Sequence, residues 1–570
     1  MTPTMRLPCV LIVIMSVAVC MFLGSSACPM YCTCDNVEKY EIAVYCRGPK
    51  ISAIPRDIPK NTTLLEISFT EVAVLRMGDF VDMPKLTQLN VWSNFKLSAV
   101  EFGTFDNLPT ITDLRLSNNS FTKLPTGLFD SLKNLTTFDG RNNKLEMIQH
   151  GLFTDHPSLQ IIRVDSGNIA VLEEGAFGGL TNLTSVYVGS NRLTSLTSSA
   201  FKGSAQLKSL LSTLYLSNIT CLKGTLNSNA LRGLNALKEV WLSFNELSTL
   251  PTTTFQSTTY ITTIWLQNNS LVELSHGLLH GLTDLNQLDL SYNRLSHLNP
   301  DTFLGLDKLR ILLLTGNNFT NMAHVSPALA LLPSQVALNL KENPFVHLDR
   351  VSFPMPMNHA NVLSMSRSHI RVIEEGTFLD VTFSNLTRLE LDQTDFLHFL
   401  PGNMLEGLDN LTAMIAYDDP FHCDCQLKAF VTWLRERVNP PYVSATCASP
   451  PSLKCKDLTD VPLASLTCDC QQVEAPSIDT SGSDNSTREG QTAMLNCKIS
   501  GCPEAEFFWT TPTGAMLAVE SGFPRMEVLG SGTLVVTEAR EEDTGVYTCT
   551  AVNYRGKTSK EVALHVDNKQ

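Results

Sequence analysis

The stretch Leu285-Asn286-Gln287-Leu288-Asp289-Leu290-Ser291-Tyr292-Asn293-Arg294-Leu295 decides the fold of this 570-residue chain. Its pattern, L-x-x-L-x-L-x-x-N-x-L, returns with a period of 24 residues. The pattern's asparagines stand at Asn245, Asn269, Asn293 and Asn317. Phenylalanines keep the same period at Phe105, Phe129, Phe153, Phe177 and Phe201. Self-similarity at a fixed period of about 20–29 residues indicates a stack of repeated units.

The pattern is the leucine-rich repeat signature, and it predicts an α/β solenoid, a horseshoe of stacked coils. Counted from the first leucine, positions 1, 4 and 6 point inward from a short strand. The asparagine at position 9 turns the chain out of the strand. Its amide has donors and an acceptor for backbone groups that would otherwise be buried unpaired. The residues between the leucines form a concave face, which is where such solenoids generally bind other macromolecules.

About 14 repeats are expected between residues 62 and 410, and the pattern has lapses. Thr70, Gly167, Ser368 and Thr394 replace the position-9 asparagine, and the repeat from Leu207 to Ala236 is longer than its neighbours. Two interpretations stay open for the irregular repeats: they carry loops or bends, or they have merely drifted.

Residues 1–27 resemble a cleavable signal peptide. Arg6 precedes an apolar run from Cys9 to Gly24, and Ser25-Ser26-Ala27 is a small-x-small cleavage site. A signal anchor is the alternative, but the run is short for a membrane span. No second apolar stretch of spanning length follows, so the chain is expected to be secreted, or to be an ectodomain cut short of its anchor. The net charge of −14 argues against nucleic-acid binding.

Cysteines cluster at both ends of the repeats, where a solenoid needs caps. Cys28, Cys32, Cys34 and Cys46 lie in a predicted N-terminal cap of residues 28–61, and Cys423, Cys425, Cys447 and Cys468 lie in a C-terminal cap of residues 411–472. These clusters resemble the cysteine-rich flanks of extracellular leucine-rich repeat proteins. In that family the first cap cysteine pairs with the third and the second with the fourth. The resemblance therefore implies disulfides Cys28–Cys34, Cys32–Cys46, Cys423–Cys447 and Cys425–Cys468.

Four cysteines, Cys221, Cys455, Cys470 and Cys502, lie outside the signal peptide, these cap pairs and the immunoglobulin pair described below. Pairing Cys455 with Cys470 is the simplest closure, and it leaves Cys502 unpaired. The alternatives are that Cys502 bridges to Cys470 or to another chain. Cys502 is expected to be exposed in a Gly501-Cys502-Pro503 turn, and Cys221 to be a buried thiol. Metal binding by these clusters is not expected in a secreted chain. His276 and His280 have no third ligand nearby in the sequence, so they too are interpreted as solvated surface, with no metal or other cofactor.

Residues 473–570 carry a different pattern. Cys497, Trp509 and Cys549 have the spacing of an immunoglobulin sandwich, and Tyr547, two residues before the second cysteine, forms the tyrosine corner. A Cys497–Cys549 disulfide is expected. The ending from Cys549 to Gly556 resembles the I-set type, an all-β sandwich, and this resemblance suggests that Asp543 pairs with Arg525.

The order of cap, repeats, cap and immunoglobulin domain is similar to the extracellular leucine-rich repeat and immunoglobulin-domain family. LINGO-type and AMIGO-type receptors belong to this family, as do secreted invertebrate proteins linked to immune recognition. The resemblance implies binding of a protein or glycan ligand, in cell adhesion or neural signalling. Innate-immune pattern recognition is the alternative, and an extracellular-matrix structural role is a further one, against which the immunoglobulin domain speaks. A dimer is possible. No enzyme motif is found.

The candidate ligand site consists of aromatic residues assigned to the concave face by the register. Trp241 and Trp265 are expected side by side on adjacent strands, and exposed tryptophans are enriched at interface hot spots. Support of a curved sheet, or cover by glycans, is the alternative interpretation of this cluster. The site is predicted to comprise Tyr187, Trp241, Phe244, Trp265 and Tyr292.

Ten N-x-S/T sequons fit a secreted glycoprotein. Two of them, at Asn118 and Asn268, fall at position 8 near the concave rim, where a glycan would narrow the available surface. The predicted glycosylation sites are Asn61, Asn118, Asn134, Asn182, Asn218, Asn268, Asn318, Asn385, Asn410 and Asn485.

Overall fold

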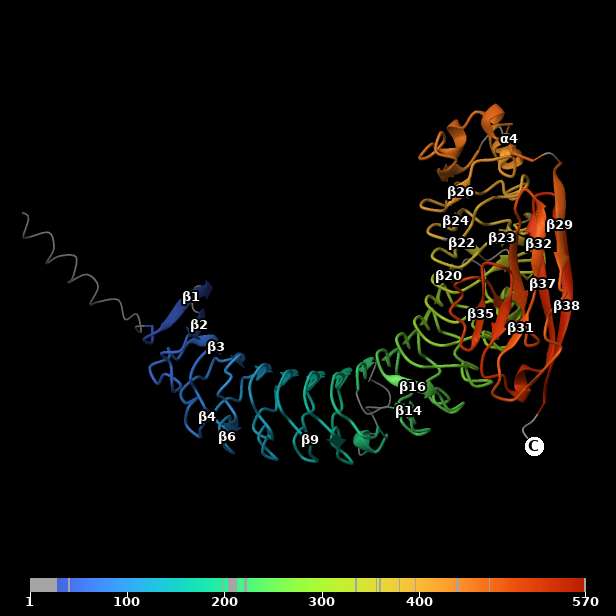
Figure 1. Ribbon diagram of the computed structural model, residues 1–570. Helices are drawn as coiled ribbons and strands as arrows, with labels where there is room; N and C mark the ends of the chain where they lie inside the picture. The colour runs from blue at the N-terminus through green and yellow to red at the C-terminus, as the bar shows by residue number, and fades with distance from the viewer. Residues whose placement is uncertain are drawn as a thin grey trace, which may run out of the picture. The chain divides into compact units, whose positions relative to one another are not determined.

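The computed structural model (Figure 1) describes most of the chain. The described residues are 28–38, 41–196, 198–202, 213–219, 223–333, 336–354, 356–357, 360–378, 380–394, 396–436, 440–470 and 472–567. The predicted signal peptide and Cys221 lie outside them. The chain divides into an N-terminal unit (residues 1–194 and 199–211) and a C-terminal unit (residues 195–198 and 212–570), and each is described by itself.

Where a coil has an asparagine at position 9, that side chain bonds the coil to the one before it. The Asn293 amide donates to the carbonyls of Leu290 in its own coil and of Leu266 in the preceding coil, at 2.9 and 3.0 Å. Its oxygen accepts the Leu271 N–H at 3.1 Å. Asn269 and Asn317 make the same set of bonds. The side chain thus satisfies backbone groups that would each cost about 1–3 kcal/mol unpaired.

The N-terminal unit is a stack of short parallel strands begun by an antiparallel pair. β1 pairs with β2 antiparallel, and β2 then begins the parallel series. The rings of Phe105, Phe129, Phe153 and Phe177 stack behind it, with successive centroids 5.7–6.4 Å apart. The strands are β1 (Cys32–Glu38), β2 (Glu41–Arg47), β3 (Thr62–Ser68), β5 (Gln88–Trp92), β7 (Asp113–Arg115), β8 (Thr137–Asp139), β10 (Ile161–Arg163) and β12 (Ser185–Tyr187), with outer pairs β4–β6 (Val74–Leu75, Ala99–Val100) and β9–β11 (Met147–Ile148, Val171–Leu172).

The C-terminal unit continues the same architecture before its immunoglobulin domain. Few helices occur among the described residues, since turns connect most strands. The parallel strands are β13 (Thr213–Tyr215), β15 (Glu239–Trp241), β17 (Thr263–Trp265), β18 (Gln287–Asp289), β19 (Ile311–Leu313), β20 (Val336–Asn339), β22 (Ala360–Ser364), β24 (Arg388–Glu390), β25 (Ala413–Ile415) and β27 (Tyr442–Ser444). The outer pairs are β14–β16 (Lys223–Thr225, Glu246–Thr249), β21–β23 (His347–Leu348, Val372–Ile373) and β26–β28 (Phe421–His422, Cys447–Ser449).

The solenoid has about 16 coils, more than the 14 or so repeats counted from the sequence. The difference arises at its ends. β2 pairs with β3 in parallel before the first expected repeat, and β25 and β27 extend the stack after residue 410. The cap segments therefore contribute coils of their own to the solenoid.

Both caps contain the disulfides that the family resemblance implies. Cys28–Cys34 and Cys32–Cys46 fasten the N-terminal cap. Cys423–Cys447 and Cys425–Cys468 fasten the C-terminal cap around α4 (Lys428–Glu436). The helix buries Phe430, Val431 and Leu434, so it covers apolar surface that the last coil would otherwise expose.

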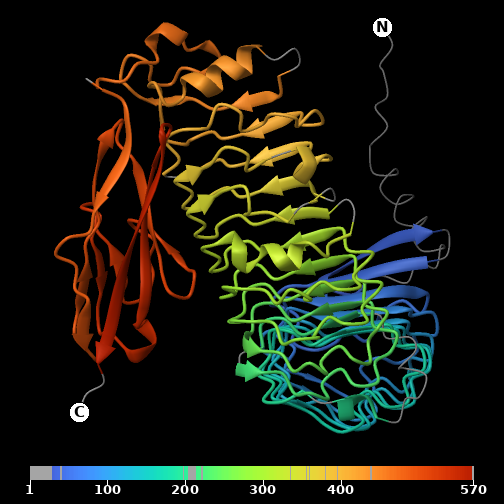
Figure 2. The ribbon, with the colours of Figure 1, turned by 90° about the vertical axis from the view of Figure 1, so that its right-hand side faces the viewer.

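The immunoglobulin domain is a sandwich of sheets whose strands pair antiparallel, apart from the parallel pair β30–β38 (Figure 2). Trp509 is fully buried and donates its indole N–H to the Gly532 carbonyl at 2.9 Å, beside the Cys497–Cys549 disulfide. The Tyr547 hydroxyl donates to the Asp543 carbonyl at 2.9 Å. The Asp543 carboxylate accepts from Arg525 at 2.8 Å, as the resemblance suggested. The strands are β29 (Glu474–Asp479), β30 (Ser486–Arg488), β31 (Ala493–Leu495), β32 (Lys498–Cys502), β33 (Glu506–Thr510), β34 (Met516–Leu517), β35 (Met526–Val528), β36 (Leu534–Val536), β37 (Gly545–Asn553) and β38 (Gly556–Asp567).

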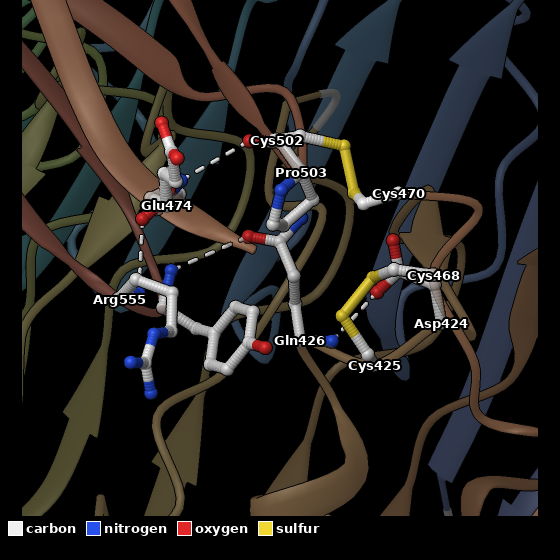
Figure 3. The surroundings of a disulfide bond; sticks show 11 residues. Asp424, Cys425, Gln426, Cys468, Cys470, Glu474, Cys502, Pro503 and Arg555 are labelled. Atoms are coloured by element: carbon white, nitrogen blue, oxygen red, sulfur yellow. Dashed lines mark hydrogen bonds between the residues drawn. A yellow bond between two sulfur atoms is a disulfide. The ribbon is translucent and has the colours of Figure 1, made fainter. Parts of the chain in front are cut away.

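The expected Cys455–Cys470 pair was wrong: Cys470 bonds to Cys502 (Figure 3). The reason is strand register. β29 pairs with β32 so that Glu474 lies opposite Cys502, which brings the short connector from Cys470 next to Cys502. Cys502 is half-buried rather than exposed and is not available to another chain. Cys455 is the free thiol among the described cysteines, and it is exposed.

Further contacts fix the immunoglobulin domain to the repeats of the C-terminal unit. The His347 ring stacks on Phe508 with centroids 4.8 Å apart. Glu374 accepts hydrogen bonds from His347 at 2.6 Å and Lys557 at 2.7 Å. Burial alone would raise the pKa of Glu374, but these two bonds outweigh it and lower that pKa to about 2. Together with the Cys470–Cys502 disulfide, these contacts make the domain part of one packed unit.

Candidate functional site

The outward side chains of the parallel strands form a face, here called the sheet face, which corresponds to the predicted concave face. In the C-terminal unit, three aromatic rings lie on it in contact. Trp241 lies opposite Trp265 in the parallel register, and their rings stack with centroids 4.8 Å apart and planes inclined by 24°. The Tyr215 ring lies 5.5 Å from Trp241. We call Tyr215, Trp241 and Trp265 the aromatic strip.

The aromatic strip lies over a hydrophobic core that is already fully packed. The residues flanking Trp241 in the sequence, Val240 and Leu242, are fully buried, and so are Ile264 and Leu266 around Trp265. The aromatic rings themselves are only half-buried. Because the inward positions already pack the coil, the rings are not needed to complete the hydrophobic core.

Tyr215 is a member of the aromatic strip that the sequence analysis missed. Its repeat is irregular and has Ile219 where the asparagine belongs, so its register was ambiguous. The signal was nevertheless present, since Leu214 and Leu216 flank Tyr215 as apolar residues flank each tryptophan of the strip. The structure resolves the register: Tyr215 lies opposite Trp241 in the parallel β13–β15 pairing.

Phe244 and Tyr292 lie at position 8, where the chain leaves the strand in a left-handed conformation. Their side chains are 56% and 46% exposed. The Tyr292 ring lies over Gly316, where an added Cβ would approach it to 2.5 Å, and its hydroxyl donates to Glu342 at 3.1 Å. These two residues therefore form the rim of the sheet face, one on each side of Asn268, and are not stacked in the strip.

Tyr187, the fifth predicted site residue, belongs to the N-terminal unit. It is half-buried at the end of β12, and the Arg163 guanidinium lies over its ring at 5.1 Å. This cation–π contact occupies one ring face, so Tyr187 is partnered differently from the aromatic strip.

Charged residues on the sheet face nearer the C-terminal cap pair with one another. Glu390 accepts from Lys341 at 2.8 Å, from Arg388 at 2.6 Å and from Ser364 at 2.8 Å. Burial would raise its pKa, but these bonds dominate and lower it to about 2. The charges of this region therefore neutralise each other, in contrast to the uncharged aromatic strip.

All ten predicted glycosylation asparagines are at least partly exposed, so none is barred by burial. Asn118, Asn218 and Asn268 share the left-handed position 8. Asn268 follows Phe244 by one coil, so a glycan there would lie at the rim of the sheet face.

Two other features bear on function. Ligand atoms of Asp424, Cys425 and Cys468 cluster within 4.8 Å of one another. The two sulfurs form a disulfide, however, and therefore supply no thiolate for a metal.

Within the part of the chain that the structure describes, no helix has the length and apolar character to cross a membrane.

Comparison with protein families identifies both architectures. The immunoglobulin I-set domain model matches residues 476–566. A leucine-rich repeat model matches residues 259–319, and a BspA-type leucine-rich repeat model matches residues 52–168 and 98–221.

Curated relatives match over part of their length. The chain is 28% identical over 219 residues to a leucine-rich repeat and fibronectin type III domain-containing protein 1-like protein of Danio rerio, covering 37% of this chain and 30% of the relative. It is 34% identical over 148 residues to human leucine-rich repeat and fibronectin type-III domain-containing protein 5, covering 26% and 19%. Human leucine-rich repeat-containing protein 4 is 32% identical over 154 residues, covering 26% and 22%. The chain thus spans less than a third of these relatives.

Among solved structures, a chain of the Toll–Spatzle complex has a similar fold, with a TM-score of 0.56 and 22% identity. The match covers 80% of this chain and 58% of that one. The repeats and the I-set sandwich agree with the family models. The chain is a leucine-rich repeat protein with an I-set immunoglobulin domain, homologous to proteins such as leucine-rich repeat-containing proteins 4 and 4B.

Proposed function

We propose that this protein is an extracellular recognition or adhesion protein that holds a protein ligand on the aromatic strip. The observation that carries the proposal is the contact of Tyr215, Trp241 and Trp265 on neighbouring strands, above a core that is already filled. Clustered aromatic residues at the centre of a surface contribute much of the binding energy in protein interfaces. Six disulfides among the described residues support an extracellular location.

The ring geometry favours a protein ligand over a glycan. A sugar stacks on an open aromatic face, whereas Trp241 and Trp265 are stacked on each other and cover one face of each ring. The exposed parts include ring edges, which suit aliphatic and aromatic side chains of a partner. Glycan recognition in innate immunity is the competing function. A screen of the protein against cell-surface ectodomains and microbial glycans separates the two, because binding to glycans alone would contradict the proposal.

Substituting both tryptophans tests the site itself. The double variant Trp241→Ala/Trp265→Ala is expected to bind an ectodomain ligand at least about 30-fold more weakly, since hot-spot residues contribute about 2 kcal/mol or more. Affinity is measured by surface plasmon resonance, and thermal unfolding shows whether the variant still folds.

Two further variants serve as controls. Tyr260→Ala removes a 60% exposed aromatic residue that lies outside the parallel strands and should leave affinity unchanged. Trp265→Phe keeps an aromatic ring, and the indole nitrogen that it loses is buried without a hydrogen-bond partner, so no hydrogen bond is lost and folding should be preserved. Unchanged affinity of a folded double variant would refute the site.

A further inference from the structure

Asp289 is a buried carboxylate on the sheet face that no cation of the described chain neutralises. It lies on β18 opposite Trp265 in the parallel register, on the side of that ring away from Trp241. The residue is 6% exposed, and its Oδ1 atom accepts the Ser291 N–H at 2.9 Å. Among the described residues, no lysine, arginine or histidine forms an ion pair with it. Buried charges in proteins are normally paired, because removing a charge from water is costly.

The same repeat position in the N-terminal unit shows how this chain neutralises such a carboxylate. Asp139 is 3% exposed, and it accepts hydrogen bonds from Nε and Nη2 of Arg141 at 3.0 and 2.9 Å. Arg141 stands two residues later, at position 7 of the repeat. The repeat of Asp289 has Ser291 at this position, so it lacks the arginine. Asp289 is therefore placed as Asp139 is, but without a counterion.

The turn that Asp289 makes does not require a negative charge. In a later repeat Asn339 occupies the same position, and its side-chain oxygen accepts the Lys341 N–H at 3.0 Å in the same way. A neutral amide is therefore sufficient for the local backbone. The local fold accounts for the Oδ1 atom of Asp289 and leaves its charge unexplained.

Asp289 lies in an acidic part of the sheet face. Of the outward residues on β13, β15, β17 and β18, only Glu239 and Asp289 are charged. Nearer the C-terminal cap, by contrast, Lys341 and Arg388 neutralise Glu390. The counterion of Asp289 therefore has to come from another molecule. The net charge of −14 disfavours a second copy of this chain, since two acidic chains repel each other.

We propose that the sheet face binds an arginine side chain of its protein ligand, which lies over Trp265 and pairs with Asp289. This inference rests on the proposed function, because it identifies the chemistry of the partner at the same site. A guanidinium is planar, so it can stack on an aromatic ring while its N–H groups donate to a carboxylate. Trp241 covers one face of Trp265, and Asp289 lies toward the other. The ligand's arginine takes the place that Arg141 has beside Asp139.

Selection from a random peptide library displayed on phage tests the chemistry of the partner on the full chain. Peptides that bind the unmodified protein but not the Trp241→Ala/Trp265→Ala variant should be enriched in arginine at least about threefold over the library. Selection on Asp289→Asn should lose this enrichment. Selection on Asp307→Asn should keep it, because this control removes an exposed carboxylate outside the parallel strands.

Calorimetry with one selected peptide measures the pairing itself. Replacing the peptide's arginine by citrulline, which keeps the shape and removes the charge, should weaken binding to the unmodified protein at least about tenfold. The same replacement should have little effect on binding to Asp289→Asn. Ser291→Arg is an independent variant, since it supplies within the repeat the arginine that Asp139 receives from Arg141. It should also weaken peptide binding at least about tenfold, with thermal unfolding as the check that each variant folds.

Two results overturn the inference and leave the proposed function standing. The tryptophan-dependent peptides show no enrichment in arginine, or the folded Asp289→Asn variant binds the arginine peptide as tightly as Asp307→Asn does. A different result overturns both proposals. In that case the library yields no peptide that distinguishes the unmodified protein from the double tryptophan variant, so the aromatic strip is not the ligand site.

Discussion

Replacing Gly532 by alanine is expected to unfold the immunoglobulin domain. Gly532 has a φ of +92°, and a Cβ added there would lie 1.8 Å from the Cys497 carbonyl oxygen. Moving the backbone away would break the hydrogen bond from the buried Trp509 indole to the Gly532 carbonyl. Both effects act in the domain core, so we expect a loss of at least about 4 kcal/mol of unfolding free energy.

Limited proteolysis and tryptophan fluorescence measure the Gly532→Ala effect. Cleavage should become rapid within residues 473–570, and Trp509 should become exposed. Gly530→Ala is the matched control two residues away, because a Cβ there meets no atom within 4 Å. It should change the unfolding free energy by no more than about 0.5 kcal/mol. Equal protease resistance of both variants would contradict the packing described for this core.

The second large effect is expected from Asp419→Asn. Asp419 occupies position 9 of the coil that begins with β25, and its Oδ1 atom accepts from the N–H and hydroxyl of Thr394 at 2.6 and 2.9 Å. Its other oxygen is buried without a partner. An earlier coil has Asn343 at position 9, and there the unpaired oxygen of Asp419 is replaced by an amide nitrogen. This nitrogen donates to the carbonyls of Leu340 and Leu314, both at 2.9 Å. A carboxylate cannot donate, whereas an asparagine can.

The sign of the pH dependence follows from the pKa of Asp419. Burial raises this pKa to about 8, despite the lowering effect of the hydrogen bonds from Thr394. Between the unfolded value of about 4 and about 8, the folded state holds a proton that the unfolded state releases. Stability therefore falls as the pH rises through this window and is level above it. Below about pH 4 both states are protonated, and Asp419 contributes no pH dependence.

Asp419→Asn removes this loss of folding stability at high pH, because an asparagine side chain does not titrate. Near pH 9 the variant is expected to be more stable than the unmodified protein by about 3–5 kcal/mol, since each pKa unit corresponds to about 1.4 kcal/mol. Near pH 4 the difference should shrink. Thermal unfolding across this range measures it, with Asp418→Asn as control because Asp418 is the exposed neighbouring carboxyl. A stability difference between Asp419→Asn and the unmodified protein that does not change with pH would contradict the account.

The repeating parts of the fold could be predicted from the sequence, because the repeat period fixes which side chains of each strand point inward and which residues of neighbouring strands lie opposite each other. Once Leu288 and Leu290 point inward, Asp289 must face outward. The same reasoning places Trp241 beside Trp265 without further information. The immunoglobulin core was predictable for a similar reason, since Cys497, Trp509 and Cys549 must meet in one sandwich.

The remaining features depend on contacts that no period specifies. Cys470 reaches Cys502 because of the β29–β32 register, and the resulting disulfide joins the C-terminal cap to the immunoglobulin domain. Asp419 was not recognised at position 9 because Met414 and Ala416 replace the leucines of its repeat.

Hydroxyl-radical footprinting tests the central claim most directly, with an ectodomain ligand identified by screening. Ligand binding should protect the rings of Tyr215, Trp241 and Trp265 from oxidation, while the exposed ring of Tyr260 stays equally reactive. Protection confined to the immunoglobulin domain or to residues outside the parallel strands, with Trp241 and Trp265 unchanged, would contradict the proposal that the aromatic strip holds the ligand.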